Sequence, residues 1–366
     1  MSPPFKSRRT PMPLPNMKTT FTKPRVGTLF SMLLCAIGTV LLGGCSKSDS
    51  STTPPTNSAA PGQTKTIGVA FETLQTEFWV AAFDKLKADC AAKGITMLEG
   101  VADGDASKQF DQVKNFINRK VDGIIIVPKD GKTVIPMIKA ANAANITVVL
   151  YNRPADASDA KHTAVAPDNF AITKETVTYL VALAKKSGKR QKAMILMGDL
   201  SDVNAIGRRD GFEAAIKEAG DAVEVVARIP TDWNQEKALA GVQSAMQANP
   251  DIGLIFTSSD FMFPSIKSVL SNLGKWKKHN EPGHIILGGF DGDATAYQLM
   301  AEGYVDATGV QDVYWEAEQA IQVILDAKAG KPAPARIDDK GFAITQANLK
   351  EMEARMWGAV VAKKKK

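Results

Sequence analysis

The chain has 366 residues, of which 44% are hydrophobic and 23% are charged, so it is long enough for two packed domains and its composition excludes disorder as the default state. Its formal net charge is +6, but residues 1–44 hold six basic and no acidic side chains, and the remainder holds 39 basic and 39 acidic ones. The body of the chain therefore lacks the basic excess that would favour nucleic acid as a partner.

The N-terminal segment has the pattern of an export signal. An apolar run at residues 26–42 follows three basic residues between positions 18 and 25, as an h-region follows an n-region. The run ends in Leu42-Gly43-Gly44-Cys45, which resembles the bacterial lipobox, where the cysteine is lipidated and becomes the first mature residue. An uncleaved membrane anchor is the alternative, but the run is at the short edge of a span and contains several small and hydroxyl residues. We therefore expect residues 1–44 to be a signal peptide and Cys45 to carry a lipid anchor.

Residues 45–64 are rich in Ser, Thr, Pro and Ala, a composition that cannot bury a core and predicts a flexible tether behind the lipidated cysteine.

If export accounts for Cys35 and Cys45, only Cys90 is left, so no disulfide is expected. Cys90 lies in a predicted helix, and we expect it to be a small buried hydrophobe.

From residue 65 onward, short apolar runs alternate with stretches that carry apolar residues at helical spacing. The runs predict strands, with helices between them, at residues 66–71, 95–98, 123–127, 146–151, 193–197, 223–229, 253–257, 285–289 and 305–310. This alternation implies parallel sheets covered by helices on both faces. About ten such units exceed one sheet of typical size, so we expect an α/β protein with two doubly wound parallel-sheet lobes.

The residues that follow the predicted strands indicate a binding cleft. Ligands of doubly wound sheets bind beyond the carboxyl ends of the strands, and here these ends are followed by amides, carboxylates, basic side chains and aromatic rings. Rings cover the apolar C–H faces of a sugar, while charged and amide groups form strong hydrogen bonds with its hydroxyls. The set predicts a polyhydroxylated ligand, although helix capping is an alternative role for a single residue such as Asp130 or Asp260.

The order and spacing of six segments carry a resemblance to a known family. They are Ile67-Gly68-Val69, Glu77-Phe78-Trp79, Gly123-Ile124-Ile125-Ile126-Val127-Pro128, Ala140-Ala141-Asn142-Ala143-Ala144-Asn145-Ile146, Arg208-Arg209-Asp210-Gly211-Phe212 and Gly289-Phe290-Asp291-Gly292. On these segments, residues 65–350 resemble the periplasmic sugar-binding proteins of the ribose, galactose and xylose type, which are the type I solute-binding proteins of ABC importers.

The resemblance implies a division of the chain into two lobes. A hinge joins the lobes, and the chain crosses it three times, near residues 165, 311 and 338. The implied parts are an N-terminal lobe of residues 65–165 and 312–337, a C-terminal lobe of residues 166–311 and 338–355, and a basic tail of residues 356–366.

The resemblance also implies which side chains contact the ligand. One ring of the Phe78 and Trp79 pair stacks on the sugar, and Asp291 is its strong acceptor. Carried over by position, the implied ligand contacts are Thr76, Phe78, Trp79, Lys129, Asn152, Arg153, Asn204, Trp233, Ser259, Asp260, Asp291 and Gln311. For Lys129, a solvated loop lysine is the alternative.

The match departs from the ribose type at several positions. Thr76 stands in place of an asparagine, Asn152 in place of a carboxylate, and the second-lobe arginine falls near Ile206. These departures argue against ribose itself as the ligand. We expect Arg208 and Arg209 to form structural pairs, with a ligand contact by one of them as the alternative. We expect Phe261 and Phe263 to belong to the core.

The implied function is that of a substrate-binding lipoprotein of an ABC-type sugar importer. Such a protein is exported to the periplasm or cell surface, anchored through Cys45, and acts as a monomer that binds a monosaccharide or related polyol and passes it to a permease. It uses no cofactor or metal, and nucleic acid is not expected as a partner. A sensing partner for a chemoreceptor or sensor kinase is the alternative within the same binding role.

A carbohydrate-active enzyme is the alternative of another class, with Asp260 and Asp291 as paired carboxylates. The sequence contains no Walker-type loop, no Gly-x-Gly-x-x-Gly after the first strand, no His-Glu-x-x-His and no Gly-x-Ser-x-Gly, and its three histidines are not at metal-ligand spacing. These absences favour a binding protein. A lac-repressor-type regulator shares the fold, but it would need an N-terminal helix-turn-helix where this chain has an export signal.

Overall fold

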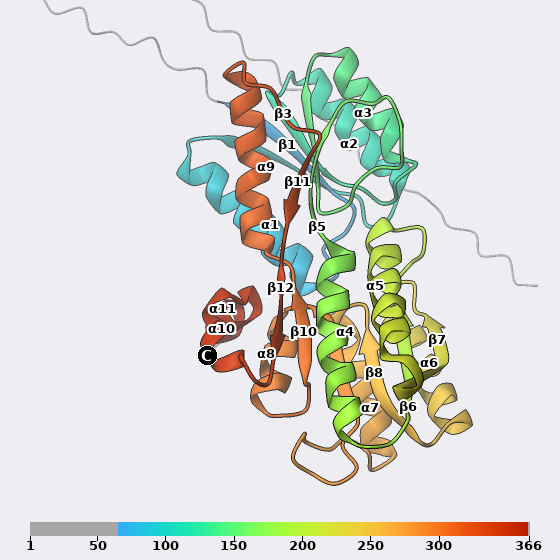
Figure 1. Cartoon of the computed structure of the whole chain (residues 1–366). Coiled ribbons are helices and arrows are strands. Elements are labelled where there is room, and N and C mark those ends of the chain that lie inside the picture. The colour runs from blue at the N-terminus through green and yellow to red at the C-terminus, as the bar shows by residue number, and fades with distance from the viewer. Residues whose placement is uncertain (1–64, 365–366) are drawn as a thin grey trace, which may run out of the picture. The chain divides into compact units, whose positions relative to one another are not determined.

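Runs of buried, largely β-branched residues form two six-stranded sheets in the computed structural model, which describes residues 65–364 (Figure 1). Helices pack on the faces of both sheets, so the predicted α/β class with two parallel-dominated sheets is confirmed. The predicted signal peptide, the tether and Cys45 lie outside the described residues.

The first sheet and its helices form what we call the N-lobe. Its strands pair in parallel throughout, in the order β11-β5-β4-β3-β1-β2. The strands are β1 (Thr66–Phe71), β2 (Thr96–Val101), β3 (Gly123–Val127), β4 (Thr147–Tyr151), β5 (Thr163–Pro167) and β11 (Arg336–Asp339). The helices are α1 (Glu77–Ala92), α2 (Ala106–Asn118), α3 (Val134–Ala143) and α9 (Val313–Lys328).

The second sheet and its helices form the C-lobe. Its order is β12-β10-β9-β8-β6-β7, parallel except for the antiparallel pair of β10 and β12. The strands are β6 (Gln191–Met197), β7 (Val223–Pro230), β8 (Ile252–Thr257), β9 (Ile286–Asp291), β10 (Ala307–Val310) and β12 (Phe342–Thr345). The helices are α4 (Asn169–Lys186), α5 (Val203–Ala219), α6 (Gln235–Ala248), α7 (Phe263–Asn272), α8 (Ala294–Ala301), α10 (Leu349–Met352) and α11 (Trp357–Lys364), with short 3₁₀ turns η1 (Gly220–Ala222), η2 (Asp260–Met262) and η3 (Glu353–Arg355).

Strand β3 shows why its sequence is apolar without alternation. Ile124 and Ile126 pack into the cluster that includes α2 and α3, whereas Ile125 and Val127 pack into the cluster that includes α1 and α9. Successive side chains of a strand point to opposite faces, so a strand covered on both faces must be apolar at every position. Because the central strands of each sheet run parallel, their carboxyl ends lie at one edge of that sheet.

The chain passes between the two sheets three times. It leaves the first sheet after β5, returns after β10, and passes again between β11 and β12, which are separated by only two residues. Figure 1 shows these passages between the two groups of elements. Residues close to the passages, such as Asn169 and Gln311, are therefore connected by the backbone to elements of both lobes.

Nine of the twelve strands lie where the sequence predicts them, with ends that differ by a few residues. Strands β5, β11 and β12 were not among the predictions. Strand β5 reads Thr-Ala-Val-Ala-Pro, which has only one large apolar side chain, and β11 and β12 are four residues each. Short strands of this kind give no distinct apolar run.

Helix α11 lies where the sequence predicts a basic tail. Trp357, Ala359 and Ala362 are buried, and the helix packs against α8 in the C-lobe (Figure 1). The expectation of a tail is therefore wrong for residues 357–364, because an apolar helix face precedes the terminal lysines.

Two smaller findings concern membrane-spanning helices and the reactivity of the Cys90 thiol. No helix within residues 65–364 combines the length and apolarity needed to cross a bilayer. Cys90 is buried in α1 as expected, and burial raises the pKa of its thiol to about 11, so the thiolate form is scarce at neutral pH.

Candidate functional site

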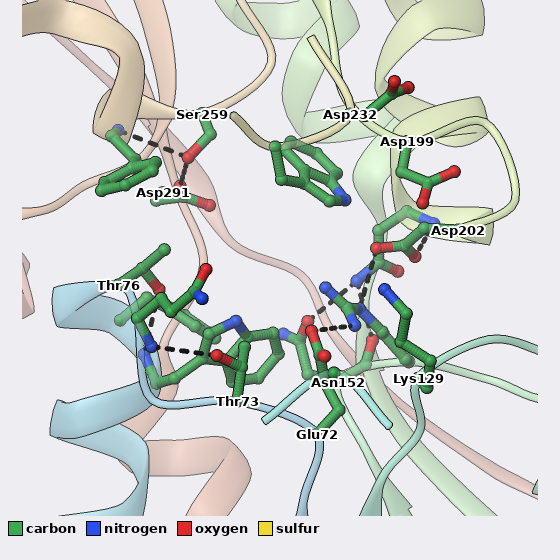
Figure 2. A pocket seen from close by; sticks show the side chains of 18 of the residues that line it. Glu72, Thr73, Thr76, Lys129, Asn152, Asp199, Asp202, Asp232, Ser259 and Asp291 are labelled. Carbon is green, nitrogen blue, oxygen red and sulfur yellow. Dashed lines mark hydrogen bonds and ion pairs between the residues drawn. The ribbon is translucent and has the colours of Figure 1, made fainter. Parts of the chain in front are cut away.

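A cavity of about 220 Å³ lies between the lobes at the carboxyl ends of the central strands (Figure 2). Its N-lobe wall consists of Glu72, Thr73, Gln75, Thr76, Phe78, Trp79, Gly104, Lys129, Asn152 and Arg153. Its C-lobe wall consists of Asp199, Asp202, Asn204, Arg208, Asp232, Trp233, Ser259, Phe261 and Asp291, and Gln311 joins from the passage between β10 and α9. Eleven of the twelve ligand contacts predicted from the sequence line this cavity, and Asp260 does not.

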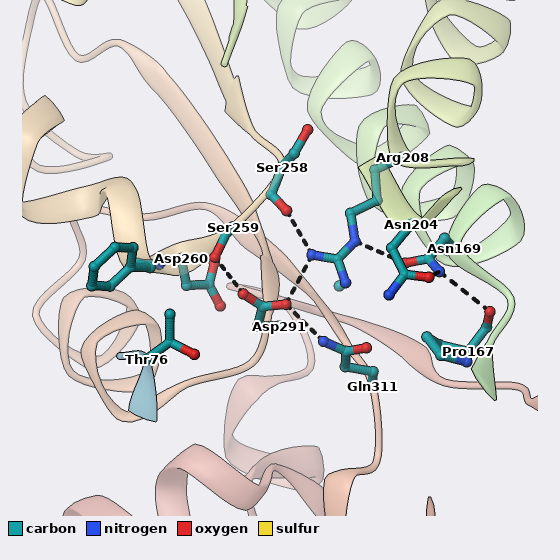
Figure 3. Close-up of polar contacts among 12 residues, drawn as sticks. Thr76, Pro167, Asn169, Asn204, Arg208, Ser258, Ser259, Asp260, Asp291 and Gln311 are labelled. Carbon is teal, nitrogen blue, oxygen red and sulfur yellow. Dashed lines mark hydrogen bonds and ion pairs between the residues drawn. The ribbon is translucent and has the colours of Figure 1, made fainter. Parts of the chain in front are cut away.

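Asp291 is the most strongly held acceptor of the cavity. Its carboxylate accepts hydrogen bonds from Arg208 Nη1 at 3.0 Å, Ser259 Oγ at 2.6 Å and Gln311 Nε2 at 2.7 Å (Figure 3). Burial raises the pKa of Asp291, while the charge of Arg208 and these hydrogen bonds act to lower it. The side chain is thus oriented and bonded before any ligand arrives, which reduces what binding must reorganise.

Arg208 lines the cavity and also forms the structural pair that the sequence predicted, with Asp291 as its partner. Besides Asp291, its guanidinium donates to Asn169 Oδ1 at 2.7 Å and to Ser258 O at 2.8 Å, and it lies 3.8 Å from the centre of the Phe290 ring. The position near Ile206 at which the resemblance placed a second-lobe arginine is two residues earlier on α5. Arg209, in contrast, pairs with the exposed Asp210.

Hydrogen bonds link Arg208 and Asp291 in a closed ring of six side chains, which we call the polar ring. From donor to acceptor it runs Arg208 to Asn169 (2.7 Å), Asn169 to Asn204 (3.0 Å), Asn204 to Asn152 (2.8 Å), Asn152 to Gln311 (2.9 Å) and Gln311 to Asp291 (2.7 Å), and the Arg208–Asp291 pair closes it. Each amide accepts through its oxygen and donates through its nitrogen, so the orientation of every amide is fixed.

Asn152 connects the lobes within this ring. It belongs to the N-lobe at the end of β4, has φ 63°, and accepts from Asn204 of the C-lobe. Its Nδ2 also donates to the buried carboxylate of Glu316, at 3.0 and 3.2 Å to the two oxygens. A carboxylate at position 152 would have no proton to donate to Gln311 or Glu316, so the amide that departs from the family pattern is required by its neighbours.

Arg153 forms a second polar link across the cavity. It donates to Glu72 Oε1 at 2.9 Å within the N-lobe, and its Nε lies 2.8 Å from Asp202 Oδ2 of the C-lobe. The guanidinium also lies 5.1 Å from the centre of the Trp79 ring. All three charged side chains are at least 90% shielded, and together they carry one net negative charge.

Lys129 lies near these acidic groups. Figure 2 shows it with Asp199 and Asp202 at one end of the cavity, while Ser259 and Asp291 lie at the other. Within residues 65–364 its ammonium group makes no ion pair within 4.0 Å, although its charge helps to lower the pKa of Asp199. Lys129 lines the cavity, and its contact with a ligand stays a prediction.

The aromatic side chains enclose the cavity from both lobes. Phe78 and Trp79 are nearly buried and meet edge to face at 4.9 Å, and Trp233 lines the C-lobe wall with a backbone φ of 57°. A Cβ at position 198 would overlap the Trp233 indole, so Gly198 lets this ring lie against the end of β6. Phe261, which was expected in the core, also lines the cavity and is half-buried, whereas Phe263 is buried in the core as expected.

Asp260 supports the site without lining it. It is fully buried and accepts from Gly292 N at 2.7 Å, Asp293 N at 3.3 Å and Thr308 Oγ1 at 2.9 Å. Burial and the neighbouring carboxylates raise the pKa of Asp260 well above its ordinary value. Asp260 therefore holds the turn after β9, and it cannot act on a ligand in the cavity as the second carboxylate of a pair with Asp291.

Several cavity residues were not predicted as contacts. Glu72 and Thr73 directly follow β1, and Asp199 and Asp202 follow β6, so the rule that strand ends form the site would have found them if applied to every residue of each loop. Arg208 lies one turn into α5, where that rule does not reach. In the part of the chain that the structure describes, no group of three or more His, Cys, Asp or Glu side chains is arranged to hold a metal ion.

Comparison with known proteins places this architecture among binding proteins. Residues 67–332 match the model of the periplasmic binding protein domain. The ribose import binding protein of Bacillus subtilis (strain 168) is 26% identical over 299 residues, which cover 82% of this chain and 93% of that protein. The D-allose-binding periplasmic protein of Escherichia coli (strain K12) is 24% identical over 275 residues, covering 73% of this chain and 86% of that protein.

Solved structures agree with the fold. An ABC transporter solute-binding protein of Mycobacterium smegmatis with bound glycerol superposes with a TM-score of 0.71 at 28% identity, covering 79% of this chain and 97% of its own. A periplasmic solute-binding protein of Actinobacillus succinogenes 130z with bound D-allose has a TM-score of 0.73 at 24% identity, covering 78% of this chain and 99% of its own.

The polar ring generates a prediction for position 152. In Asn152→Asp a further carboxylate faces Glu316, whose pKa burial and the neighbouring carboxylate of Asp339 already raise well above its usual value. We expect the variant to lose about 3 kcal/mol of unfolding free energy at pH 8. The loss should shrink toward pH 5, because two facing carboxyls have raised folded-state pKa values and share a proton more readily as the pH falls.

Urea unfolding followed by tryptophan fluorescence at pH 5 and pH 8 measures this difference. Asn142→Asp is the matched control, because the side chain of Asn142 is at an exposed site and its hydrogen bonds are to the backbone of Lys161. Equal losses in the two variants, or a loss at position 152 that does not depend on pH, would contradict the proposed geometry.

Proposed function

The chain belongs to the periplasmic binding protein domain family, and we propose that it is the substrate-binding component of an ABC-type sugar importer, with one monosaccharide or related polyol bound between its lobes. The observation that carries this proposal is the prearranged acceptor Asp291, bonded to Arg208, Ser259 and Gln311 in a cavity that aromatic rings enclose from both lobes. Relatives named as ribose and allose binding proteins support the ligand class.

The size of the cavity supports a single small ring. Its volume of about 220 Å³ lies below the range of roughly 300–1,000 Å³ that is usual for sites of drug-sized ligands, so it suits one compact ring with its hydroxyls. Phe78, Trp79 and Trp233 offer faces for the C–H groups of such a ring, and the acidic and amide groups offer acceptors for its hydroxyls.

The charge of the cavity narrows the ligand class further. Five carboxylates and three basic groups line it, and each arginine is already paired with a carboxylate. Lys237 pairs with Asp232 from outside the lining, which still leaves one negative charge in excess. A ligand with its own carboxylate would enter a shielded and negatively charged space, so we infer that the ligand is neutral or carries an amine.

Ligand capture then proceeds by closure of the lobes. Both walls supply contacts, so only a closed form completes the set, and a ligand that bridges the walls shifts the population toward it. A micromolar dissociation constant corresponds to about −8 kcal/mol, which a few charge-assisted hydrogen bonds and a stacked ring supply after the cost of closure. The closed form would deliver the sugar to the permease of the importer.

The family implies export to the periplasm, and we propose in addition that the mature protein is held at a membrane by a lipid on Cys45. The basis is the Leu42-Gly43-Gly44-Cys45 sequence and the tether of residues 45–64. A role as the sensing partner of a chemoreceptor or sensor kinase would use the same cleft and the same anchor.

Replacement of Asp291 tests the binding site. Asp291→Asn keeps the size of the side chain but removes the charge that strengthens its bonds to ligand hydroxyls, so the dissociation constant should rise at least about tenfold. A thermal-shift screen against sugars and polyols identifies the ligand, and calorimetry then compares the variant with Asp210→Asn, an exposed aspartate paired with Arg209. A wild-type protein that no sugar or polyol stabilises would refute the function, and an unchanged affinity in Asp291→Asn would refute the site.

Matched ligands test the charge of the cavity. For the best sugar of the screen, we expect its uronic acid to bind at least about tenfold more weakly and its amino derivative to bind at least as tightly as the neutral sugar. Competition calorimetry at pH 7 and low salt measures the order. Tight binding of the acid would overturn the inference about charge while leaving the sugar-binding function intact.

The lipid anchor is tested by detergent partition. The protein expressed from the full chain in a bacterium should enter the detergent phase and carry a mass increment for the lipid, whereas Cys45→Ser should remain in the aqueous phase. A Cys35→Ser variant serves as the control, since Cys35 lies within the predicted signal peptide. Aqueous partition of the unaltered protein would contradict the anchor.

A further inference from the structure

Helix α11 contacts the backbone that carries Asp291. The indole Nε1 of Trp357 donates to Asp291 O at 2.8 Å, and Gly358 N donates to Gly292 O at 3.1 Å. Trp357 is 2% exposed. A Cβ at position 358 would overlap the backbone of Gly292 and Asp293, so glycine at this position lets the start of the helix lie directly against residues 291–293, which we call the acceptor turn.

The acceptor turn has an unfavourable backbone conformation. Asp291 has φ 124° and Gly292 has φ 76°, and side-chain-bearing residues rarely adopt the first of these values. Such a conformation costs free energy and persists only where surrounding contacts hold it in place. The orientation of the Asp291 carboxylate toward the cavity therefore depends on what holds the backbone of the turn.

Contacts from several elements hold the turn. Asp260 accepts from Gly292 N at 2.7 Å, and Glu77, which begins α1 in the N-lobe, accepts from Ala294 N at 2.9 Å. Trp357 acts from the remaining side, where its N–H meets the carbonyl of Asp291 itself. The bond is buried and neutral, so its loss would leave the carbonyl with a desolvated acceptor site.

Trp357 also touches the opposite lobe. Its ring meets the ring of Phe78 edge to face, with centroids 5.8 Å apart and an angle of 74° between the planes. Phe78 lines the cavity from the N-lobe, whereas α11 packs on α8 of the C-lobe. The contact between the two rings therefore exists only while the lobes lie together, and it adds an aromatic pair to the closed form.

We propose that Trp357 is a positioning residue of the ligand site, which holds the backbone of Asp291 in its strained conformation and gives Phe78 a surface to meet when the lobes close. Trp357 itself does not line the cavity, so it acts through these two residues. The consequence for ligand affinity rests on the proposed sugar-binding function, while the consequence for the acceptor turn does not.

Trp357→Phe separates positioning from general packing, because it keeps an aromatic ring and removes the N–H donor. We expect the dissociation constant of the best sugar to rise about tenfold, chiefly through faster dissociation. In the ligand-free protein we expect amide hydrogen exchange to become several-fold faster in the peptide that covers residues 289–296. Trp276→Phe is the matched control, since Trp276 stacks on Tyr304 at 4.8 Å in the same lobe and does not line the cavity.

A second variant guards against a simple loss of folding. Gly358→Ala keeps the indole but forces the start of α11 away from the acceptor turn, and it should shift exchange and affinity in the same direction. Melting temperatures of all variants show whether each is folded at the temperature of the assay. Unchanged exchange at residues 289–296 in both variants, or affinity changes no larger than in Trp276→Phe, would overturn the proposal. If the unaltered protein binds no sugar, the proposed function fails, and the exchange data still decide the positioning role.

Discussion

The burial of Asp291 beside Arg208 is the constraint on which the rest of the site depends. Two opposite charges shielded from water are stable only if their remaining hydrogen-bonding atoms are also satisfied, because the interior does not compensate their lost hydration. Ser259, Gln311, Asn169 and the carbonyl of Ser258 provide the missing partners. All four of these partners come from strand ends or passages between the lobes, so satisfying one ion pair fixes the geometry of the cavity.

The polar ring extends this constraint across the two lobes. Asn204 of the C-lobe donates to Asn152 of the N-lobe, and Arg153 lies against Asp202 in the same way. If the lobes separate, each of these groups bonds to water in place of its partner. The polar contacts between the lobes therefore contribute little net free energy to closure. The free energy that holds the closed form must then come largely from the ligand and from apolar contacts, which is the condition for a closure that responds to ligand.

The sequence predicted the central architecture well because its strands are buried on both faces and therefore lack alternation. Among the predicted ligand contacts, Asn152 and Gln311 directly follow strands, and both line the cavity. The prediction from the sequence failed where position depends on contacts distant in the sequence. Asp260 follows a strand yet turns into the core toward Thr308, and Trp357 reaches the site from beyond the last strand of the sheet. No local sequence pattern predicts either of these two contacts.

The amide at position 152 illustrates how such distant contacts decide a local departure from a family pattern. Glu316 of α9 lies behind Asn152, buried and without an ion pair within residues 65–364, and it accepts from the amide nitrogen. The acidic side chain here is Glu316, which lies behind position 152, whereas the resemblance places a carboxylate at position 152 itself. The cavity surface presents the amide of Asn152, which is already hydrogen-bonded to Gln311 and Asn204. Under the proposed function, the ligand would meet at this position a neutral group with little free hydrogen-bonding capacity. The negative charge in excess therefore lies near Arg153, beside Glu72 and Asp202, because Asp291 is paired with Arg208. Under the proposed function, Asp291 and this cluster, rather than the hinge side between them, would contact the hydroxyls or the amine of a ring.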